Sequence, residues 1–440
     1  MSANVDLNVP CLGECKVDSP LELNCTDGDE IANFVRDDRR LVMDASLQSF
    51  REHRDAGTEP TSFEMAGPRS KIYFDPTKVK AAIVTCGGLC PGLNNVIRGL
   101  VLQLWYRYGV RSIFGARYGF EGFIAKYGHS LWELNPTAVG DIHEMGGTVL
   151  GSSRGAQDVT EIVDSLERLN IRILFTVGGD GTLRGAQGIY EEVTRRGLKI
   201  AVVGVPKTID NDIPFISRTF GYDTAVDMAT LAIRSAHVEA QGAPNGVGVV
   251  KLMGRHSGYI ACSAALAMRE VNLVLVPEQR FDFDGERGIL AFLQKRLKER
   301  GHSVVVVAEG AGQDIFEASG ERDASGNVKL QNIGPYLSDR IKEHFKGLGW
   351  DINLKYIDPS YIIRAAPANS KDAIFCGSLA EHAAHAAMAG ETGMVVGLWH
   401  DQFTHVPLTA ATQARKVVDL EGELWRSTLE STGQPPILHG

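Results

Sequence analysis

Short, continuously apolar runs alternate with longer amphipathic stretches from about residue 80 onward. The apolar runs predict strands at 80–86, 112–116, 172–177, 199–205, 246–252, 273–276, 303–308 and 394–398. The amphipathic stretches predict helices at 94–108, 156–169, 182–196, 222–239, 285–300 and 370–389. Strands that are apolar throughout and alternate with helices are typical of parallel sheets covered on both faces. The pattern therefore predicts an α/β protein with two doubly wound, mostly parallel-sheet domains facing a cleft.

Residues 1–76 lack this alternation and carry clusters of charged side chains at 27–30, 36–40 and 51–55. We interpret them as an N-terminal extension that wraps around the core or packs on a neighbouring subunit, with short helices around 28–37 and 44–53. The rest of the chain is expected to form a larger α/β domain from 77–221 plus about 364–410. A smaller α/β domain is expected from 222–363 plus about 411–440.

The composition narrows the class of protein. The 440 residues include 45 Lys and Arg against 54 Asp and Glu, a formal net charge of −9. This balance argues against nucleic acid as a partner, because phosphate backbones are bound by basic faces. Apolar residues make up 44%, enough for a packed core, and no apolar run is long enough to span a membrane.

Seven cysteines, an odd number, and the lack of a signal peptide favour a reducing, cytoplasmic location. Two pairs, Cys11 with Cys15 and Cys86 with Cys90, could each supply half of the ligands of a metal site. Their spacing is one residue wider than in the usual zinc knuckle, and no partner pair of Cys or His lies nearby in the sequence. Zinc is therefore not expected at either pair.

Two glycine-rich segments follow predicted strands directly, at 87–92 (Gly-Gly-Leu-Cys-Pro-Gly) and 178–182 (Gly-Gly-Asp-Gly-Thr). In open α/β sheets, ligands bind beyond the carboxyl ends of the strands. The first segment offers close backbone approach and helix amides to a phosphate, although it lacks the ending of a Walker A loop and a tight turn would explain it equally well. The second places an acid between glycines, which suits Mg²⁺ carrying phosphates.

A pair of carboxylates, Asp210 and Asp212, follows the strand that ends at Val205. One carboxylate can take the proton of an attacking hydroxyl while the other orients that group or binds metal through water. Like charges this close also raise the pKa of at least one of them. An Asp-Asn turn is the structural alternative. Because this is a further polar strand end in the same chain, we favour the catalytic interpretation.

Three more charged residues follow apolar runs: Arg255 after 246–252, Glu309 after 303–308, and Arg364 after the short run 361–363. The two guanidinium groups suit bidentate phosphate binding, and the acid suits sugar hydroxyls. Any one of them alone would be explained by a surface ion pair. Their repeated position at the ends of predicted strands favours a binding site for a sugar phosphate.

Together these segments resemble the 6-phosphofructokinase family. The matching motifs, spread from about Lys71 to Leu408, are Gly-Gly-x-x-Pro-Gly-x-Asn at 87–94, Gly-Gly-Thr-x-Leu-Gly-Ser at 146–152, Gly-Gly-Asp-Gly-Thr at 178–182, Pro-Lys-Thr-Ile-Asp-Asn-Asp at 206–212, Met-Gly-Arg at 253–255 and Val-Pro-Glu at 276–278. In combination they are highly specific. The N-terminal extension, and Tyr361 where short bacterial enzymes carry a histidine, are similar to the long-chain branch of plant-type and trypanosome-type ATP enzymes and many pyrophosphate enzymes.

The resemblance implies phosphoryl transfer from ATP to the 1-hydroxyl of fructose 6-phosphate in glycolysis, with Mg²⁺ at Asp180 and Asp210 as the base, in a homodimer or homotetramer. The implied donor-binding residues are Gly88, Arg154, Gly155, Gly179, Asp180, Gly181 and Thr182. The implied substrate-binding residues are Thr208, Ile209, Asp210, Asp212, Met253, Gly254, Arg255, Glu309, Tyr361, Ile362, Ile363 and Arg364.

Two positions bear on the phosphoryl donor. Pyrophosphate-dependent relatives typically carry Asp at the position of Gly181, where a carboxylate repels the α-phosphate of ATP, so glycine leaves the adenosine side open. Lys207 points the other way, because pyrophosphate enzymes also carry it. A lysine tolerates ATP, whereas a carboxylate against phosphate is a direct electrostatic penalty. ATP is therefore the expected donor, with pyrophosphate as the alternative.

Two other functions are open to a chain with these features. An NAD kinase would share the Gly-Gly-Asp-Gly motif, but it would need neither the Met-Gly-Arg segment nor the pair of Asp210 and Asp212. A non-catalytic regulatory or sensor subunit would keep the fold, but it would be expected to lose the base or the metal ligand. Asp210 and Asp180 are both present, which favours an enzyme.

Overall fold

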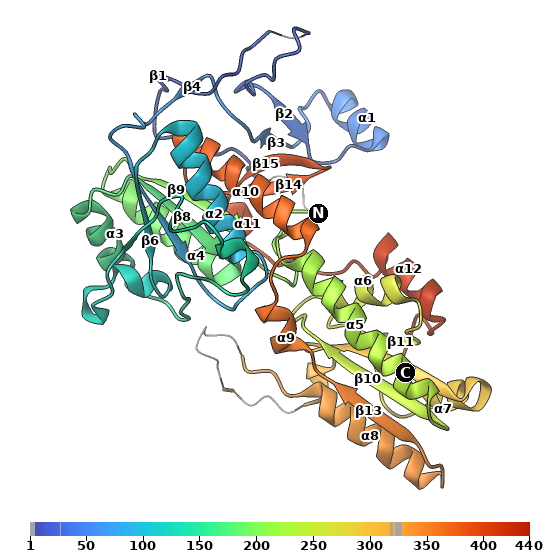
Figure 1. The fold of residues 1–440 in the computed structure, drawn as a ribbon. Helices are drawn as coiled ribbons and strands as arrows, with labels where there is room; N and C mark the ends of the chain where they lie inside the picture. The colour runs from blue at the N-terminus through green and yellow to red at the C-terminus, as the bar shows by residue number, and fades with distance from the viewer. Residues whose placement is uncertain (1–4, 27, 317–319, 322–327) are drawn as a thin grey trace. The chain divides into compact units, whose positions relative to one another are not determined.

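The computed structural model describes residues 5–26, 28–316, 320–321 and 328–440. The chain folds into two compact units (Figure 1). The first comprises Met1–Thr208, Ile213–Phe220 and Pro367–Ala414, and the second comprises Ile209–Asp212, Gly221–Ala366 and Arg415–Gly440. The segment with the two neighbouring aspartates is thus part of the second unit, although the strand before it belongs to the first.

The first unit is built on a nine-stranded sheet in the order β2-β3-β15-β14-β9-β8-β5-β6-β7. The strands are β2 (Arg40–Val42), β3 (Ser62–Met65), β5 (Lys80–Thr85), β6 (Ser112–Ala116), β7 (Trp132–Glu133), β8 (Ile173–Gly178), β9 (Ala201–Pro206), β14 (Met394–Trp399) and β15 (Gln402–Pro407). The five central strands from β14 to β6 are parallel. The edge strands β15, β3, β2 and β7 pair antiparallel. A separate antiparallel pair joins β1 (Val17–Asp18) to β4 (Lys71–Ile72).

Helices such as α4 and α10 pack against this sheet (Figure 1). The helical segments of the unit are α1 (Leu47–Ala56), which buries none of its residues, α2 (Leu93–Leu102), which continues as the π-helical η1 (Gln103–Tyr108), the 3₁₀ turns η2 (Gly119–Phe123), η3 (Ala125–Tyr127) and η4 (Ile142–Glu144), α3 (Val159–Arg168), α4 (Asp180–Arg195), α10 (Ser370–Met388) and α11 (Leu408–Ala411). Side chains of β8 and β9 are buried along their whole length, as their apolar sequences predict. Helices α2 and α10 approach closely at Gly99, where a Cβ would lie 2.7 Å from Ala380 Cβ.

The second unit has a four-stranded, fully parallel sheet in the order β11-β12-β10-β13. Its strands are β10 (Gly246–Leu252), β11 (Leu273–Leu275), β12 (His302–Ala308) and β13 (Asn353–Ile357). Its helices are α5 (Tyr222–Gln241), α6 (Tyr259–Met268), α7 (Ile289–Arg300), the 3₁₀ turn η5 (Gln313–Ile315), α8 (Ile333–Gly347), α9 (Ser360–Ala365) and α12 (Glu423–Thr432). An apolar core that includes Val249, Leu275, Val305, Leu337 and Phe345 packs this sheet against its helices.

The α/β class and the mostly parallel sheets confirm the prediction from the apolar runs. Two local predictions are wrong. The described residues of 28–37 form turns instead of a helix, because Asn24 and Asp29 accept hydrogen bonds from nearby main-chain amides (Thr26 N to Asn24 Oδ1, 3.2 Å; Ile31 N to Asp29 Oδ1, 3.1 Å). The run 361–363 is not a strand but lies in helix α9. The strand before it is β13, whose polar residues gave a weak signal.

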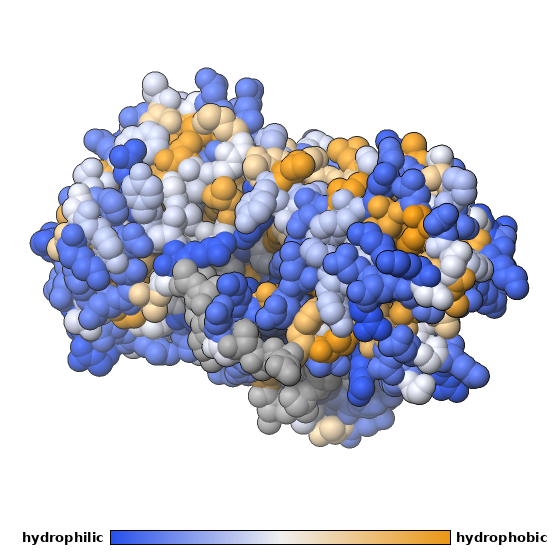
Figure 2. All heavy atoms as spheres, turned by 90° about the horizontal axis from the view of Figure 1, so that it is seen from below, coloured by the Kyte–Doolittle hydropathy of each residue, from blue (hydrophilic) through white to orange (hydrophobic). Residues whose placement is uncertain are grey.

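Figure 2 shows that hydrophilic residues cover most of the face in view, with apolar residues in scattered groups. Among the described residues, no helix is both long and apolar enough to span a bilayer.

Candidate active site

Three neighbouring parallel strands of the first unit, β5, β8 and β9, end at the same edge of the sheet. Thr85 pairs with Val177, and Gly178 pairs with Pro206. The loops that follow are tied together by main-chain bonds, from Gly87 N to Ser153 O (3.1 Å) and from Lys207 N to Gly178 O (3.0 Å). This edge therefore gathers the glycine segments 87–92 and 178–182, the loop 151–157 and the segment 206–208. The first three contain the predicted donor-binding residues, and the last contains Lys207, predicted to bear on the choice of donor, and Thr208, predicted to bind the substrate.

The glycines of the segment 178–182 differ in what packing requires of them. A Cβ at Gly178 would lie 2.1 Å from Thr182 Oγ1, and a Cβ at Gly179 would lie 3.1 Å from Lys207 O. A Cβ at Gly181 would meet nothing within 4 Å. Packing within the protein therefore requires glycine at the first position and favours it at the second, whereas Gly181 faces open space. The space beside Gly181 can hold a ligand or a larger side chain.

Asp180 is the first residue of α4 and carries a partly exposed carboxylate. Its Oδ1 pairs with Arg184 Nε at 3.0 Å, and its side chain is 20% exposed. Among the described residues, no side chain caps the helix, whose N-cap is Gly179. An uncapped helix N-terminus presents amides to an anion, and a neighbouring carboxylate can carry Mg²⁺. A carboxylate next to an open glycine loop fits a phosphate-bound Mg²⁺.

Lys207 is almost completely buried in the first unit, and its ammonium donates to Gly88 O. A Cβ at Gly87 would lie 3.3 Å from its Nζ, so the lysine sits directly against the first glycine loop. Ser152 Oγ donates to Gly87 O at 2.6 Å from the other loop. Lys207 therefore supports the backbone of the glycine segment 87–92.

The other predicted donor-side residues lie on the same loops. Arg154 and Gly155 are exposed, and Gly155 has a φ of 99°, a conformation that favours glycine. Thr182 is buried against Gly178. Thr208, the last residue before the chain enters the second unit, accepts a hydrogen bond from Thr219 Oγ1 through its carbonyl at 2.6 Å.

In the second unit, Asp210 lies against the loop that follows β10. Its Oδ2 accepts from Arg255 N at 3.2 Å, and its carbonyl accepts from Ser257 Oγ at 2.7 Å. Gly254 makes this turn possible, with a φ of 124° and no room for a Cβ, which would lie 2.4 Å from Ser257 O. The adjacent strand β12 ends beside it, where Glu309 N donates to Leu252 O at 2.8 Å.

The electrostatics of this cluster favour a proton acceptor poised near neutral pH. Burial raises the pKa of Asp210 to about 7, helped by the charges of Asp212 and Glu309 and opposed by the Arg255 amide and by Arg364. Burial also raises the pKa of Glu309, while Lys251, Arg364 and Arg255 oppose that shift. A general base is most effective when its pKa lies near the working pH. The second unit thus brings together Asp210, Asp212, Arg255, Glu309 and Arg364.

The remaining predicted substrate-side residues differ in exposure. Tyr361 and Ile362 are 82% and 65% exposed on α9, whereas Ile363 is fully buried. Ile209 and Met253 are also buried. A contact from the three buried residues to a ligand would therefore come from the main chain. Their substrate-binding roles stay predictions.

A protein-family model described as Phosphofructokinase matches residues 80–387. The chain belongs to the phosphofructokinase family. A relative named ATP-dependent 6-phosphofructokinase from Borreliella burgdorferi is 47% identical over 442 residues, covering 98% of this chain and 97% of its own. Relatives with the same name from Amycolatopsis methanolica and Trypanosoma brucei brucei are 49% and 50% identical, covering 98% and 85% of this chain and 95% and 77% of their own.

Solved phosphofructokinase structures share the fold. The pyrophosphate-dependent phosphofructokinase from Nitrosospira multiformis superposes with a TM-score of 0.67 over 83% of this chain and 92% of its own, at 21% identity. The Pichia pastoris phosphofructokinase in the T-state superposes with a TM-score of 0.64 over 83% of this chain and 38% of its own, at 20% identity. At such identities the likeness concerns architecture alone.

The sequence patterns did not predict that Lys416 lies beside Asp212. Its amide donates to Asp212 O at 2.9 Å, and its ammonium lies 5.1 Å from the centre of the Tyr259 ring. Burial lowers the pKa of Lys416 to about 7, and the charge of Asp212 opposes that shift. The residue follows no strand and belongs to no motif. Only the return of the chain to the second unit at Arg415 places it beside Asp212.

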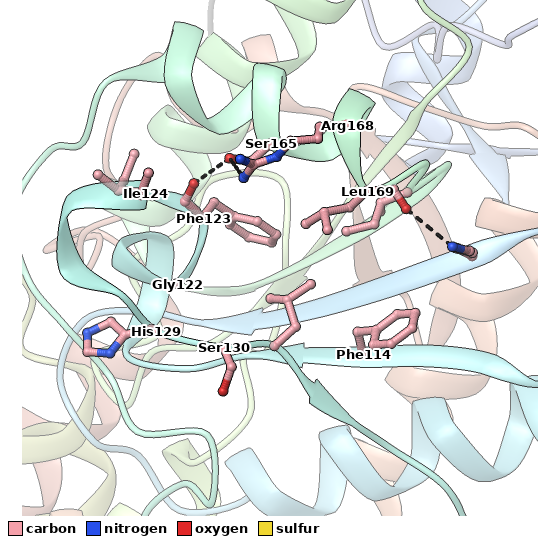
Figure 3. Close-up of a pocket in the computed structure, with 13 residues that line it drawn as sticks. Phe114, Gly122, Phe123, Ile124, His129, Ser130, Ser165, Arg168 and Leu169 are labelled. Atoms are coloured by element: carbon pink, nitrogen blue, oxygen red, sulfur yellow. Dashed lines mark hydrogen bonds between the residues drawn. The ribbon is translucent and has the colours of Figure 1, made fainter.

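A pocket of about 310 Å³ lies in the first unit, between η2, β6 and the end of α3 (Figure 3). Its walls include Phe114, Phe123 and Leu169, and Ser165 Oγ on α3 donates to Phe123 O at 2.6 Å. None of the predicted site residues lines it. The phosphofructokinase chemistry is therefore expected at the strand-end loops and not in this pocket.

Proposed function

We propose that this chain transfers the γ-phosphoryl group of ATP to the 1-hydroxyl of fructose 6-phosphate, producing fructose 1,6-bisphosphate and ADP. The observation that carries the proposal is the cluster of Asp210 with Asp212, Arg255, Glu309 and Arg364 in a chain whose relatives at 47–50% identity are named ATP-dependent 6-phosphofructokinase. The cluster supplies an acid pair for a hydroxyl and two guanidinium groups for a phosphate.

On the donor side, we assign the phosphates of ATP to the loops of Gly88 and Gly179–Thr182, with Arg154 and Gly155 completing the site. The glycines allow the backbone to approach the phosphates, and the uncapped start of α4 directs amides and its helix dipole at them. Asp180 would hold Mg²⁺, which neutralises charge on the transferred phosphoryl group when it is bound. Its pairing with Arg184 keeps the carboxylate oriented.

On the acceptor side, Asp210 takes the proton of the 1-hydroxyl as the oxygen attacks the γ-phosphorus. Its amide partner at Arg255 holds the carboxylate, and burial together with the charge of Asp212 keeps the pKa of Asp210 high enough for it to accept a proton. Arg255 and Arg364 bind the 6-phosphate, and Glu309 accepts from sugar hydroxyls. Met253, Gly254, Tyr361, Ile362 and Ile363 shape the sugar site with Thr208 and Ile209.

ATP is assigned as the donor on the local chemistry of two residues. Gly181 leaves open space where an aspartate would oppose the α-phosphate. Lys207, the residue that favoured pyrophosphate, bonds to Gly88 O and so has a structural role that is compatible with either donor. We further expect a cytoplasmic enzyme that assembles as a homodimer or homotetramer.

The product identifies the reaction. Incubation of the purified protein with Mg²⁺, ATP and fructose 6-phosphate is expected to form ADP and fructose 1,6-bisphosphate in equal amounts. Phosphorus NMR and a coupled assay measure the two products. Chelation of Mg²⁺ with EDTA should stop the reaction. Hydrolysis of ATP without a sugar bisphosphate, or phosphorylation of a nucleotide acceptor instead, would contradict the assignment.

The pH dependence should follow Asp210. The base works only when it is deprotonated, so kcat/KM for fructose 6-phosphate is expected to rise as the pH passes through about 7, the pKa of this carboxyl. Asp212→Asn removes a like charge, which lowers the pKa of Asp210 and moves the acid limb of the profile to lower pH. Asp212→Glu keeps the charge and should leave the limb closer to that of the wild type. If the acid limb of the pH profile did not move in Asp212→Asn, a group other than Asp210 would determine its position.

A further inference from the structure

A second group of metal-ligating side chains lies in the first unit, outside the loops assigned to the donor. Glu64 of β3 and His405 of β15 face one another across the antiparallel ladder, and Glu391 lies in the turn between α10 and β14. One ligand atom from each of the three lies within 4.8 Å of the other two. Glu391 precedes β14, which runs parallel to β9. It therefore lies beyond the amino ends of these strands, whereas the donor loops follow carboxyl ends.

The histidine of this group lies at ligand spacing from one of the carboxylates. His405 is 1% exposed, and its Nδ1 is 3.3 Å from Glu64 Oε1. Two ligands that each lie about 2.0–2.2 Å from one tetrahedral zinc ion are separated by roughly this distance. An ion bound by Nδ1 and Oε1 would replace the direct contact between the two side chains.

The carboxylates of the cluster share one guanidinium group among the described residues. Arg69 pairs with Glu64 at 3.2 Å and with the exposed Asp37 at 3.0 Å. Glu391 forms no ion pair within the part of the chain that the structure describes. A divalent cation bound by Glu64 and Glu391 would balance the charge of these two neighbouring carboxylates.

The cluster also lies where the N-terminal segment attaches to the first unit. Leu12 N donates to Gly390 O at 2.9 Å, and Thr392 N donates to Pro10 O at 3.0 Å. The thiols of Cys11 and Cys15, which the sequence presented as half a metal site without a partner, both point at Ala389 O, at 3.7 and 3.1 Å. The fold thus places Glu64, Glu391 and His405 beside this pair of cysteines, although Glu391 and His405 lie almost a whole chain length away in the sequence.

We propose that Glu64, Glu391 and His405 bind one Zn²⁺ ion, with water completing the coordination, and that this ion fastens the N-terminal segment and the edge strands to the turn before β14. A set of one imidazole and two carboxylates suits zinc, whereas Mg²⁺ prefers oxygen ligands alone. The site is therefore chemically distinct from the Mg²⁺ site at Asp180. The thiols lie beside the ion and do not bind it.

Zinc titration of the full-length protein tests this proposal. After treatment with a chelator and its removal, the chain is titrated with Zn²⁺ by calorimetry in excess Mg²⁺, without nucleotide or sugar phosphate. We expect one equivalent bound per chain and a higher melting temperature with zinc. The variants Glu391→Gln and His405→Gln should each bind roughly 100-fold more weakly. The glutamine at 391 has the shape of the protonated acid, so the apo variant should fold and melt like the apo wild type.

Two controls locate the ion. Asp37→Asn alters an exposed acid beside Arg69 and should keep the equivalent, as should the double variant Cys11→Ser with Cys15→Ser. Cobalt in place of zinc should give visible bands without the near-ultraviolet thiolate charge-transfer band. No equivalent in the wild type, unchanged binding in His405→Gln, or loss of binding in the thiol variant would each overturn the proposal. Because no turnover is measured, these outcomes are independent of the proposed phosphoryl transfer.

Discussion

Replacing Asp210 with asparagine is expected to lower kcat with ATP and fructose 6-phosphate by roughly 10³-fold, because the variant loses the group that takes the proton of the 1-hydroxyl. The amide oxygen of asparagine can still accept from Arg255 N, the 3.2 Å contact that holds the aspartate. The fold and the sugar-phosphate contacts should therefore survive, and the loss should appear in kcat while fructose 6-phosphate still binds. Stopped-flow or coupled initial rates measure the first effect, and calorimetry measures the second.

A matched control separates chemistry from a general loss of charge. Asp339 is an exposed aspartate of α8 whose partner is Lys342 at 3.4 Å. Asp339→Asn removes the same charge from the same unit and should leave kcat within about twofold, since surface substitutions outside special features have small effects. If Asp210→Asn turned over at the rate of the control, the proton would leave by another route and Asp210 would not be the base.

Gly181→Asp is expected to lower kcat/KM for ATP by at least about 100-fold, because it places a carboxylate against the α-phosphate. Two unit charges 4 Å apart repel by about 4 kcal/mol at an effective dielectric constant of 20, which corresponds to roughly a thousand-fold. The protein itself has room, since a Cβ at this position meets nothing within 4 Å. An acid in the first turn of α4 is also favourable to the helix, so the melting temperature should not fall.

The matched control at this position is Gly181→Asn, which has the shape of aspartate without its charge. If repulsion dominates, Gly181→Asn should retain much more ATP-supported activity than Gly181→Asp, and the difference should shrink at high salt. Equal losses in the two variants would assign the effect to bulk. Full ATP activity in Gly181→Asp would mean that this residue does not face the donor at all.

Continuous apolar runs made the central strands predictable, because buried parallel strands need no polar positions. β10 begins and ends at the predicted residues, and β8 and β9 differ from prediction by one or two residues. The polar, half-exposed β13 and the short edge strands gave no such signal. Helix α9 was misread because a run of three apolar residues cannot distinguish a strand from a helical turn.

The strand-end rule also found the main parts of the candidate site, since parallel strands end at the same edge of a sheet. It does not identify residues that are distant in the sequence and that come close to the site only because the chain returns to the same unit. Lys416 beside Asp212 is one such case, because its partner is more than two hundred positions away. The group of Glu64, Glu391 and His405 is another, since its members come from an edge ladder and a turn that no local pattern connects. Only the folded chain reveals these neighbours.

The choice between ATP and pyrophosphate depends on single residues. Fold alone does not decide it, since pyrophosphate-dependent phosphofructokinases with TM-scores of 0.66 and 0.67 share the architecture at 21% identity. The assignment to ATP depends on the open space at Gly181 and on the structural role of Lys207 against Gly88.

The most direct measurement is a comparison of initial rates with fructose 6-phosphate and either Mg-ATP or Mg-pyrophosphate at equal concentrations. We expect the rate with ATP to exceed the rate with pyrophosphate by roughly 100-fold or more, because the two donors differ in transition-state binding. Turnover with pyrophosphate and none with ATP would contradict it.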